Sequence, residues 1–335
     1  MDRSAVATAL SALLKGVRYR APSTSGRVMD LPGHYAGLVR IGRETLALTT
    51  DGVGSKLLLA LEMDRWEEVG EDVVAVNVND LSAVGARPAA LLDYIACRAP
   101  ESAIFAAIGR GLDRGLRKAK CSLLGGETAV VPDLVQALDL SGAALGFFPG
   151  RRRPVTGRDI HPGDLVVGLP SSGFHANGYT LVRRLLETHG VGLAERITGE
   201  RAPLGRLLLT PTRIYTAAVE AVVESGMAVG LAHISGGGVR NLVRLNPRVE
   251  FCLDSLPPPQ GVFQWVSALS ELPPSELYQT FNMGIGFVLV VRPRFETSVL
   301  DLLARTGEPR ARIIGQIRKG QGVRLPHEGV RYTSY

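Results

Sequence analysis

The sequence has few cysteines, and they are far apart. Only three occur among 335 residues, and no two of them form a CxxC pair. Zinc sites and disulfide frameworks need several suitably spaced cysteines, so the sequence offers neither. We interpret each thiol as a small core residue, as expected in the reducing cytoplasm. The three cysteines are Cys97, Cys121 and Cys252.

Several motifs of well-known enzyme classes are also missing. No GxxxxGK[ST] segment is present, so a Walker-type phosphate loop is unsupported. The GxGxxG pattern fails both at Gly52 to Gly54 and at Gly284 to Gly286. Neither HExxH nor GxSxG occurs, which argues against zincins and α/β-hydrolases.

Long apolar runs are absent as well. No segment approaches the roughly 20 apolar residues that a membrane span requires. The apolar stretch of residues 5–14 is short, follows no net positive charge and is succeeded by Lys15. It is typical of an amphipathic helix rather than of a signal peptide. We therefore expect a cytoplasmic protein that does not contact a membrane.

Lysine is scarce, with five residues against thirty-three arginines, yet the net charge is +6 and the pI is near 9.4. The basic residues are spread along the chain, and aromatic residues make up only 6%. Nucleic-acid-binding proteins usually gather basic residues on one stripe, often with aromatics between them. We favour a solvated basic surface over a nucleic-acid patch. Its mild positive field would attract an anionic small molecule such as a nucleotide.

The composition is that of a globular protein, with 45% hydrophobic and 21% charged residues. A chain of 335 residues usually forms two domains. Turn formers and arginines at residues 149–154 indicate a linker, so we predict domains at 1–154 and 155–335. Strands and helices mix in each half, which indicates α/β or α+β units. We expect strands at residues 45–50, 89–96, 122–124, 138–148, 164–169 and 285–291, and helices at 71–84, 103–120 and 178–187.

Three acidic residues have a setting that suits a metal-nucleotide site. Asp51 ends an expected strand and is followed by Gly-Val-Gly, while Glu127 follows Gly-Gly directly after another strand. Asp80 lies three residues after Asn77, on the same face of an expected helix. Mg²⁺ takes one or two carboxylates and completes its shell with water and phosphate oxygens. From the residues alone, three structural roles stay open as alternatives: Asp51 as the cap of a turn, Asp80 as a solvated carboxylate and Glu127 as the partner of an arginine.

Two polar turns in the second half are candidate phosphate sites. The segment Ser171–Tyr179 lies between an expected strand and helix, where backbone N–H groups can bind a phosphate. It contains His175, which could donate to an oxyanion or act as an acid or base. As a loop residue, His175 is expected to contribute little to stability. The turn His233–Gly238 is of the same kind, and a structural role for either histidine stays open.

Together these segments resemble the aminoimidazole ribonucleotide synthetase family, also called phosphoribosylformylglycinamidine cyclo-ligases. Seven motifs of the family occur in order and with their intervals preserved, between about residues 35 and 290. One motif alone would be weak, whereas the ordered set is highly specific. The matching segments are Thr50–Lys56, Val78–Leu81 with Gly85–Pro88 and Leu92–Tyr94, Gly125–Ala129, Ser171–Arg183, Pro211–Tyr215, His233–Gly238 and Thr280–Gly286.

The resemblance implies two α/β domains and a homodimer in which the N-terminal domains pair their sheets. It also implies that formylglycinamidine ribonucleotide and ATP give aminoimidazole ribonucleotide, ADP and phosphate in purine biosynthesis. ATP would phosphorylate the formyl oxygen, and the amidine nitrogen would then attack the formyl carbon and close the ring. The protein would mainly position the reactants and, with Mg²⁺, neutralise charge on the transferring phosphoryl group.

The resemblance carries over to individual positions as well. Metal ligands would be Asp51, Asp80 and Glu127, and residues with a catalytic role would be Asp51, Lys56 and His175. The nucleotide would contact Asp51, Gly52, Gly54, Asp80, Gly126, Glu127 and Thr128. The substrate would contact Ser172, Gly173, His175, Asn177, Gly236 and Gly237.

Two other functions stay open at this point. Related enzymes with the same architecture include selenophosphate synthetase and thiamine-monophosphate kinase, so an ATP-dependent phosphotransferase is one alternative. The other is a non-catalytic nucleotide-binding paralogue. The presence together of Asp51, Asp80, Glu127 and His175 argues against that second alternative.

Overall fold

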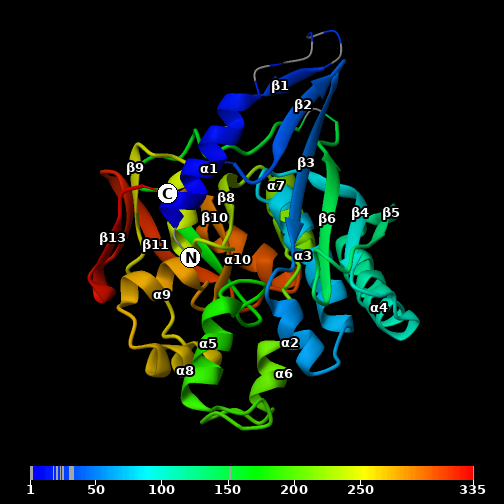
Figure 1. Cartoon of the computed structure of the whole chain (residues 1–335). Helices are drawn as coiled ribbons and strands as arrows, with labels where there is room; N and C mark the ends of the chain where they lie inside the picture. The colour runs from blue at the N-terminus through cyan, green and yellow to red at the C-terminus, as the bar shows by residue number, and fades with distance from the viewer. Residues whose placement is uncertain are drawn as a thin grey trace.

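Two β-sheets lie side by side in the computed structural model, each with helices packed against it (Figure 1). The structure describes residues 3–17, 19, 22, 24, 26–29, 34–150 and 152–334. Strands of the first sheet come from the N-terminal half and strands of the second from the C-terminal half. The predicted domain boundary at residues 154 and 155 falls between the two sheets. Residue 151 of the expected linker lies outside the described residues.

The first sheet has six strands in the order β1-β2-β3-β6-β4-β5. Its neighbouring strands are antiparallel, except that β4 and β5 run parallel. Strand β5 is the last strand in this order and therefore forms one edge of the sheet. The strands are β1 (Arg27–Met29), β2 (Gly37–Ile41), β3 (Glu44–Gly52), β4 (Arg87–Cys97), β5 (Ser122–Val130) and β6 (Leu138–Phe147).

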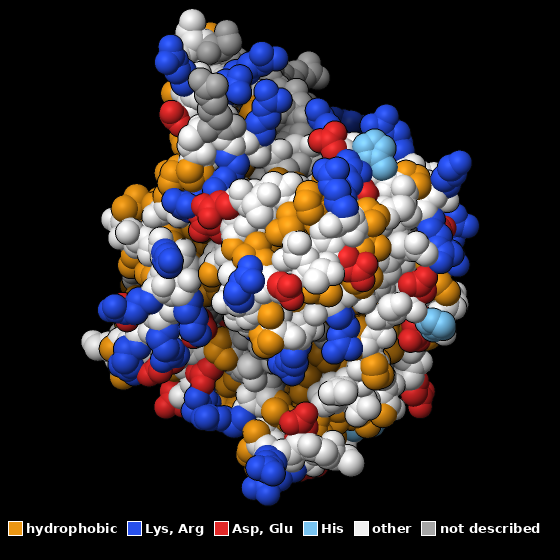
Figure 2. Space-filling view, turned by 180° about the vertical axis from the view of Figure 1, so that it is seen from behind, with side chains coloured by type: hydrophobic (Ala, Val, Ile, Leu, Met, Phe, Trp, Pro, Cys, Tyr) orange, Lys and Arg blue, Asp and Glu red, His pale blue; other side chains and the backbone are white. Residues whose placement is uncertain are grey.

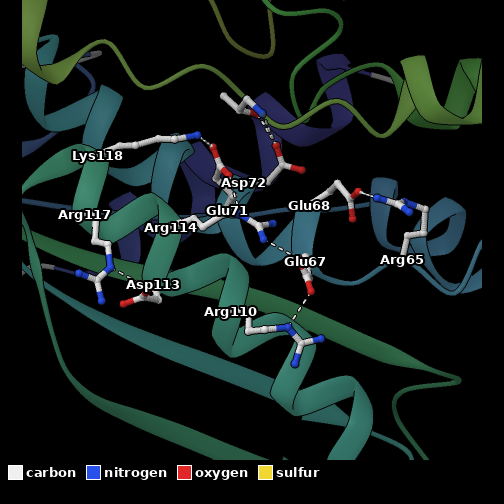
Figure 3. A network of polar contacts seen from close by, with 11 residues as sticks. Arg65, Glu67, Glu68, Glu71, Asp72, Arg110, Asp113, Arg114, Arg117 and Lys118 are labelled. Carbon is white, nitrogen blue, oxygen red and sulfur yellow. Dashed lines mark hydrogen bonds and ion pairs between the residues drawn. The ribbon is translucent and has the colours of Figure 1, made fainter. Parts of the chain in front are cut away.

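Helix α3 (Glu67–Ser82) is buried on nearly all sides, although half of its residues are polar or charged. It packs on β3, β6 and β4 of the first sheet, on helix α4 (Ser102–Ala119), and on α7 (Thr216–Glu224) and β8 (Ala228–His233) of the second half. Ion pairs reinforce its contact with α4: Glu67 and Glu71 point toward Arg114 and Lys118 (Figure 3). Helix α3 therefore forms the junction between the two halves of the protein.

The second sheet has seven strands in the order β13-β12-β9-β11-β7-β10-β8. All its neighbouring strands are antiparallel, apart from the parallel pair β9 and β12. Strand β10 lies between β7 and β8 and is buried along its whole length. The strands are β7 (Leu165–Pro170), β8 (Ala228–His233), β9 (Val249–Cys252), β10 (Ile285–Val291), β11 (Arg312–Lys319), β12 (Gly322–Leu325) and β13 (Val330–Tyr332).

The remaining helices are short. Besides α3 and α4, the α-helices are α1 (Arg3–Gly16), α2 (Lys56–Glu62), α5 (Tyr179–His189), α6 (Leu204–Leu208), α7 (Thr216–Glu224), α8 (Val262–Ser270), α9 (Pro274–Thr280) and α10 (Glu296–Arg305). The 3₁₀ segments are η1 (Gly238–Arg244), η2 (Pro293–Phe295) and η3 (Pro326–Glu328).

The predicted elements are present, with shifted ends. The helix expected from residue 71 begins at Glu67, and the strand expected to end at Thr50 includes Asp51 and Gly52. The prediction that Glu127 follows a strand is wrong, because β5 extends to Val130. The glycines before Glu127 do not end the strand, since β4 provides backbone hydrogen-bond partners along this stretch.

The positions of charged side chains on the surface agree with the spread of basic residues along the sequence (Figure 2). Lysine and arginine side chains are spread over the face drawn in Figure 2, with aspartate and glutamate side chains between them. In the part of the chain that the structure describes, no helix is long and apolar enough to cross a membrane. The three cysteines are free and buried.

Candidate active site

Two polar side chains of α3 hold a C-terminal segment against the N-terminal half. Asp72 Oδ1 accepts hydrogen bonds from the Thr212 backbone N–H at 2.7 Å and from the Thr212 hydroxyl at 2.6 Å. Further along the helix, Asn79 donates to the Arg213 carbonyl at 2.8 Å and accepts from the Tyr215 N–H at 3.0 Å. The segment Thr212–Tyr215 is thus fixed to α3 at both ends.

Lys56 completes this junction. Its ammonium lies 2.6 Å from Asp72 Oδ2, and both side chains are 0% exposed. It also donates to the carbonyls of His175 at 3.1 Å and Thr210 at 2.8 Å. The ammonium is therefore surrounded by three protein oxygens. Lys56 thus connects the two halves of the protein through buried contacts, and its catalytic role as a phosphate partner stays a prediction.

Asp51 is held at the end of β3 by Asn77 of α3. The Asn77 amide accepts from the Asp51 N–H at 3.0 Å and donates to the Asp51 carbonyl at 3.1 Å. The Asp51 carboxylate accepts from the N–H of Gly52 at 2.8 Å. Burial raises the pKa of Asp51, and the nearby Asp80 carboxylate raises it further. The charge of Asp51 is thus disfavoured both by its partly buried place and by a second carboxylate nearby.

Asp80 is held from the opposite side by His233, at the end of β8. His233 Nδ1 lies 2.8 Å from Asp80 Oδ1, so its N–H donates to the carboxylate. The His233 side chain is 1% exposed, and its Nε2 has no hydrogen-bond partner in the described part of the chain. The turn that begins at His233 therefore lies beside Asp80.

His175 is buried, contrary to the expectation for a loop residue. It is 1% exposed and has a left-handed backbone with φ +62°. Its Nε2 accepts from the Ser172 N–H at 3.3 Å, which puts the proton of the neutral ring on Nδ1. Burial lowers the pKa of His175 well below 6.5, and His233, Lys56 and Arg213 lower it further. At neutral pH the imidazole is therefore uncharged, with a buried Nδ1 that lacks a partner among the described residues.

The loops that follow β7 and β8 meet the turn before β10. Asn282 donates to the Gly173 carbonyl at 2.9 Å, which joins the turn to the loop that contains His175. A Cβ added to Gly236 would lie 2.9 Å from Asn177 Oδ1, so these two residues are in close contact. Gly237 has φ +108°, a conformation that favours glycine. The predicted substrate-binding residues are thus gathered in one loop cluster.

The acidic residues of the first sheet lie on two different faces. Asp51 pairs with Gly142, which pairs in turn with Asp93, and Asp93 pairs with Gly126. Paired residues of neighbouring strands share a face, so Asp51 and Asp93 are on the same side. Glu127 is one residue further along β5 and faces the other side.

Glu127 is therefore separated from the other two predicted metal ligands, and the three-carboxylate metal site stays a prediction. Among the described residues, no three histidine, cysteine, aspartate or glutamate side chains gather in a way that could hold a metal ion. The structure brings Asp51 and Asp80 together, while Glu127 and Thr128 lie on the edge strand, away from them. Gly52 lies beside Asp51 and Gly54 in the turn that follows, with φ +67°.

Comparison with known proteins identifies the two halves. The AIR synthase related protein N-terminal domain matches residues 33–148, and the corresponding C-terminal domain matches residues 161–328. The chain belongs to the AIR synthase family. A phosphoribosylformylglycinamidine cyclo-ligase of Methanothermobacter thermautotrophicus is 43% identical over 296 residues, which cover 88% of this chain and 86% of that protein.

More distant members of the AIR synthase fold are found among solved structures. A HypE-HypF complex has a TM-score of 0.68 at 17% identity, covering 96% of this chain and 97% of that one. AaThiL complexed with AMPPCP and TMP has a TM-score of 0.64 at 18% identity, covering 96% and 93%. At such identities the likeness shows the shared fold.

The sequence did not predict individual roles for three residues that lie at the site of this AIR synthase family member. They are Asp72, Asp93 and His233, of which only His233 belongs to a predicted polar turn. The signal for Asp72 is a carboxylate directly before the apolar run Val73–Val76 of the helix, because a carboxylate buried beside such a run needs a partner. The His233 contact with Asp80 joins residues 153 apart, so sequence spacing could not reveal it.

Proposed function

We propose that this protein catalyses the ATP-dependent cyclisation of formylglycinamidine ribonucleotide to aminoimidazole ribonucleotide, with release of ADP and phosphate, in purine biosynthesis. The observation that carries the proposal is the 43% identity to a curated cyclo-ligase over 88% of the chain. The fold agrees with it, and contacts between Lys56 and His175 and between Asp80 and His233 bring four of the family's motifs together at the junction. We place the protein in the cytoplasm, consistent with its three free cysteines.

Asp51 and Asp80 are the residues proposed to hold Mg²⁺ with the nucleotide. The structure offers a test of fit, because burial raises the pKa of Asp51 and repulsion from the nearby Asp80 carboxylate raises it further. A hard divalent cation would relieve this repulsion, and carboxylate oxygens are the ligands that Mg²⁺ prefers. When bound, magnesium supplies charge neutralisation for phosphoryl transfer. AMPPCP in AaThiL, an analogue of ATP, supports ATP as the nucleotide.

The chain's own residues bind and orient the substrate in the proposed reaction. We assign substrate binding to the loop cluster of Ser172, Gly173, Asn177, Gly236 and Gly237, whose loops are held by Asn282 at Gly173 and by the contact of Asn177 with Gly236. The neutral imidazole of His175 serves as a hydrogen-bond donor through Nδ1, because its Nε2 already accepts a hydrogen bond from Ser172. A donor in a place without water stabilises negative charge that develops on a transferred phosphoryl group.

In the first step, the terminal phosphoryl group of ATP is transferred to the formyl oxygen of the substrate. The bond between the terminal phosphorus and the bridging oxygen of ATP breaks, which leaves ADP. The amidine nitrogen then attacks the formyl carbon, and loss of phosphate together with protons on nitrogen completes the ring. Asp51 and Lys56 differ in this scheme: Asp51 acts on the nucleotide side, whereas Lys56 positions the loop that contains His175.

A homodimer through the first sheet is also proposed. Strand β5 is an open edge, and its Leu124 is 68% exposed. Leu92 and Tyr94 of the neighbouring strand β4 are exposed on the same region of the sheet. Exposed apolar edges are normally covered by another chain or element. A second copy that covers this edge would bury more than about 2,000 Å² in total, as obligate interfaces do.

Product formation tests the proposed function. Purified protein is mixed with ATP, Mg²⁺ and formylglycinamidine ribonucleotide, and both ADP and the aminoimidazole product are measured. We expect equimolar ADP and product, and neither when Mg²⁺ or the amidine substrate is omitted. If ATP binds but no product forms under any condition, the chain is a non-catalytic nucleotide-binding paralogue. ADP formed without ring closure would instead indicate a phosphotransferase.

A further inference from the structure

A pocket of about 370 Å³ lies within the C-terminal half and is lined by the Ser171–Gly173 segment but not by the buried His175. Its walls are the end of β7, the proline-rich segment before α8, the turn before β10, and Arg310 with Arg312 at the start of β11. The volume falls in the range that small-ligand sites occupy, about 300–1,000 Å³. None of its charged residues belongs to the predicted nucleotide site.

Two arginines give this pocket its positive charge. Arg310 and Arg312 are exposed, and neither side chain makes a hydrogen bond or an ion pair within the described part of the chain. Glu308, the acidic residue nearest Arg310 in sequence, is already bound by Arg213 at 2.8 Å. Guanidinium groups bind phosphate through paired N–H donors, so two of them at one pocket favour a phosphate monoester.

Other groups in the pocket suit the sugar that such a phosphate would carry. The Glu200 carboxylate lies against Gly261, since a Cβ added to that glycine would be 2.5 Å from Glu200 Oε1. This carboxylate has no hydrogen-bond donor among the described residues, so it is available to accept from sugar hydroxyls. The Ser171 hydroxyl is buried and has no partner in the described structure. A buried hydroxyl without a partner costs free energy that a bound ligand would recover.

We propose that this pocket binds the ribose 5-phosphate end of the nucleotide substrate, with Arg310 and Arg312 on the phosphate and Glu200 on the ribose. This inference rests on the proposed function for its substrate. Ser172 connects the pocket with the reaction site, because it lines the pocket and its backbone N–H donates to His175 Nε2. Occupancy of the pocket would thereby fix the loop that orients the His175 imidazole.

Binding of ribose 5-phosphate tests the pocket without any catalysis. Isothermal titration of the full chain with ribose 5-phosphate should show one site per chain, with ribose as the neutral comparison. Arg310→Gln and Arg312→Gln should each weaken this binding about 10- to 100-fold, as expected for loss of one charge-assisted contact. The matched control is Arg305→Gln, an exposed arginine of the same half that does not line the pocket. Equal binding in all variants would overturn the proposal.

Steady-state kinetics then identify the ligand as the substrate. Each pocket variant should raise the KM for formylglycinamidine ribonucleotide by about 10-fold or more with little change in kcat, while the KM for ATP stays constant. If ribose 5-phosphate binding is lost but the substrate KM is unchanged, the pocket is a separate sugar-phosphate site and the assignment is wrong. If the wild-type protein makes no product yet binds ribose 5-phosphate through these arginines, the proposed function fails while the pocket stands.

Discussion

The buried Lys56 allows a sharp test of the junction. We expect Lys56→Met to destabilise the protein strongly, because it leaves the Asp72 carboxylate without its ammonium partner at 0% exposure. Removing one member of a buried ion pair costs about 3–5 kcal/mol. At about 2–4 °C per kcal/mol for a domain of this size, the thermal midpoint should fall by roughly 6–20 °C. Urea unfolding followed by circular dichroism gives the free energy directly.

A second substitution separates the lost charge from the lost packing. Asp72→Asn removes the charge and keeps an oxygen that can accept from Thr212. The double variant of Lys56→Met and Asp72→Asn should therefore be more stable than Lys56→Met alone. We expect a coupling free energy of about 1–3 kcal/mol between the two positions. Lys118→Met is the matched control: Lys118 pairs with Glu71 but is 57% exposed, so its loss should cost about 1 kcal/mol or less.

The same variants decide between the structural and the catalytic assignment of Lys56. If Lys56 is structural, folded Lys56→Met protein has a lower kcat, because the His175 carbonyl loses the ammonium that holds its loop. If Lys56 instead contacted a phosphate, the KM for ATP would rise and stability would hardly change. A loss of less than about 1 kcal/mol, or additive effects in the double variant, would rule out the buried ion pair as the link between the two halves.

Three further predictions concern the candidate site and the sheet edge. Asp51→Asn should lower turnover on the order of 10²-fold or more, and near-normal turnover would argue against the metal-site assignment. The same change should raise the thermal midpoint of the nucleotide-free protein, because it removes a charge that burial and Asp80 both disfavour. For His175, the folded state has the lowered pKa and the unfolded state takes up the proton, so wild-type stability should fall on acidification below pH 6.5, by at most about 1.4 kcal/mol per pH unit. His175→Asn should show a shallower loss between pH 6.5 and 5.5 and turnover lower by about 10²- to 10³-fold; an unchanged pH slope would contradict the buried neutral imidazole. Leu124→Asp should convert a dimer to monomers in light scattering, whereas Leu61→Asp, at an exposed leucine of α2, should not; a wild-type monomer at micromolar concentration would remove the dimer proposal.

Local patterns predict most of the elements that surround the site. The apolar spacing in residues 71–84 indicates helix α3, and the apolar run before Asp51 indicates β3. The predicted end of β5 is wrong, since Gly125 and Gly126 suggest a strand end where the strand continues. Glycine permits a turn but does not require one, and pairing with β4 decides the outcome.

The contacts between the two halves are beyond prediction from the sequence. Lys56 and Asp72 lie 16 residues apart, and nothing in their spacing indicates that both are fully buried. Their environment depends on Thr210 and Thr212, which a different domain contributes. The same holds for His175, whose loop position suggests exposure although the folded protein encloses it. Burial of polar groups arises from tertiary packing, which local periodicity does not encode.

The fate of the formyl oxygen distinguishes the proposed cyclisation from both alternatives. Formylglycinamidine ribonucleotide labelled with ¹⁸O in the formyl group is converted with unlabelled ATP in unlabelled water, and the released phosphate is analysed by mass spectrometry. Because the proposed reaction places the phosphoryl group on that oxygen before the ring closes, one ¹⁸O atom should appear in each phosphate, matched by one aminoimidazole product. Unlabelled phosphate, or labelled phosphate without the ring product, would contradict the proposed reaction.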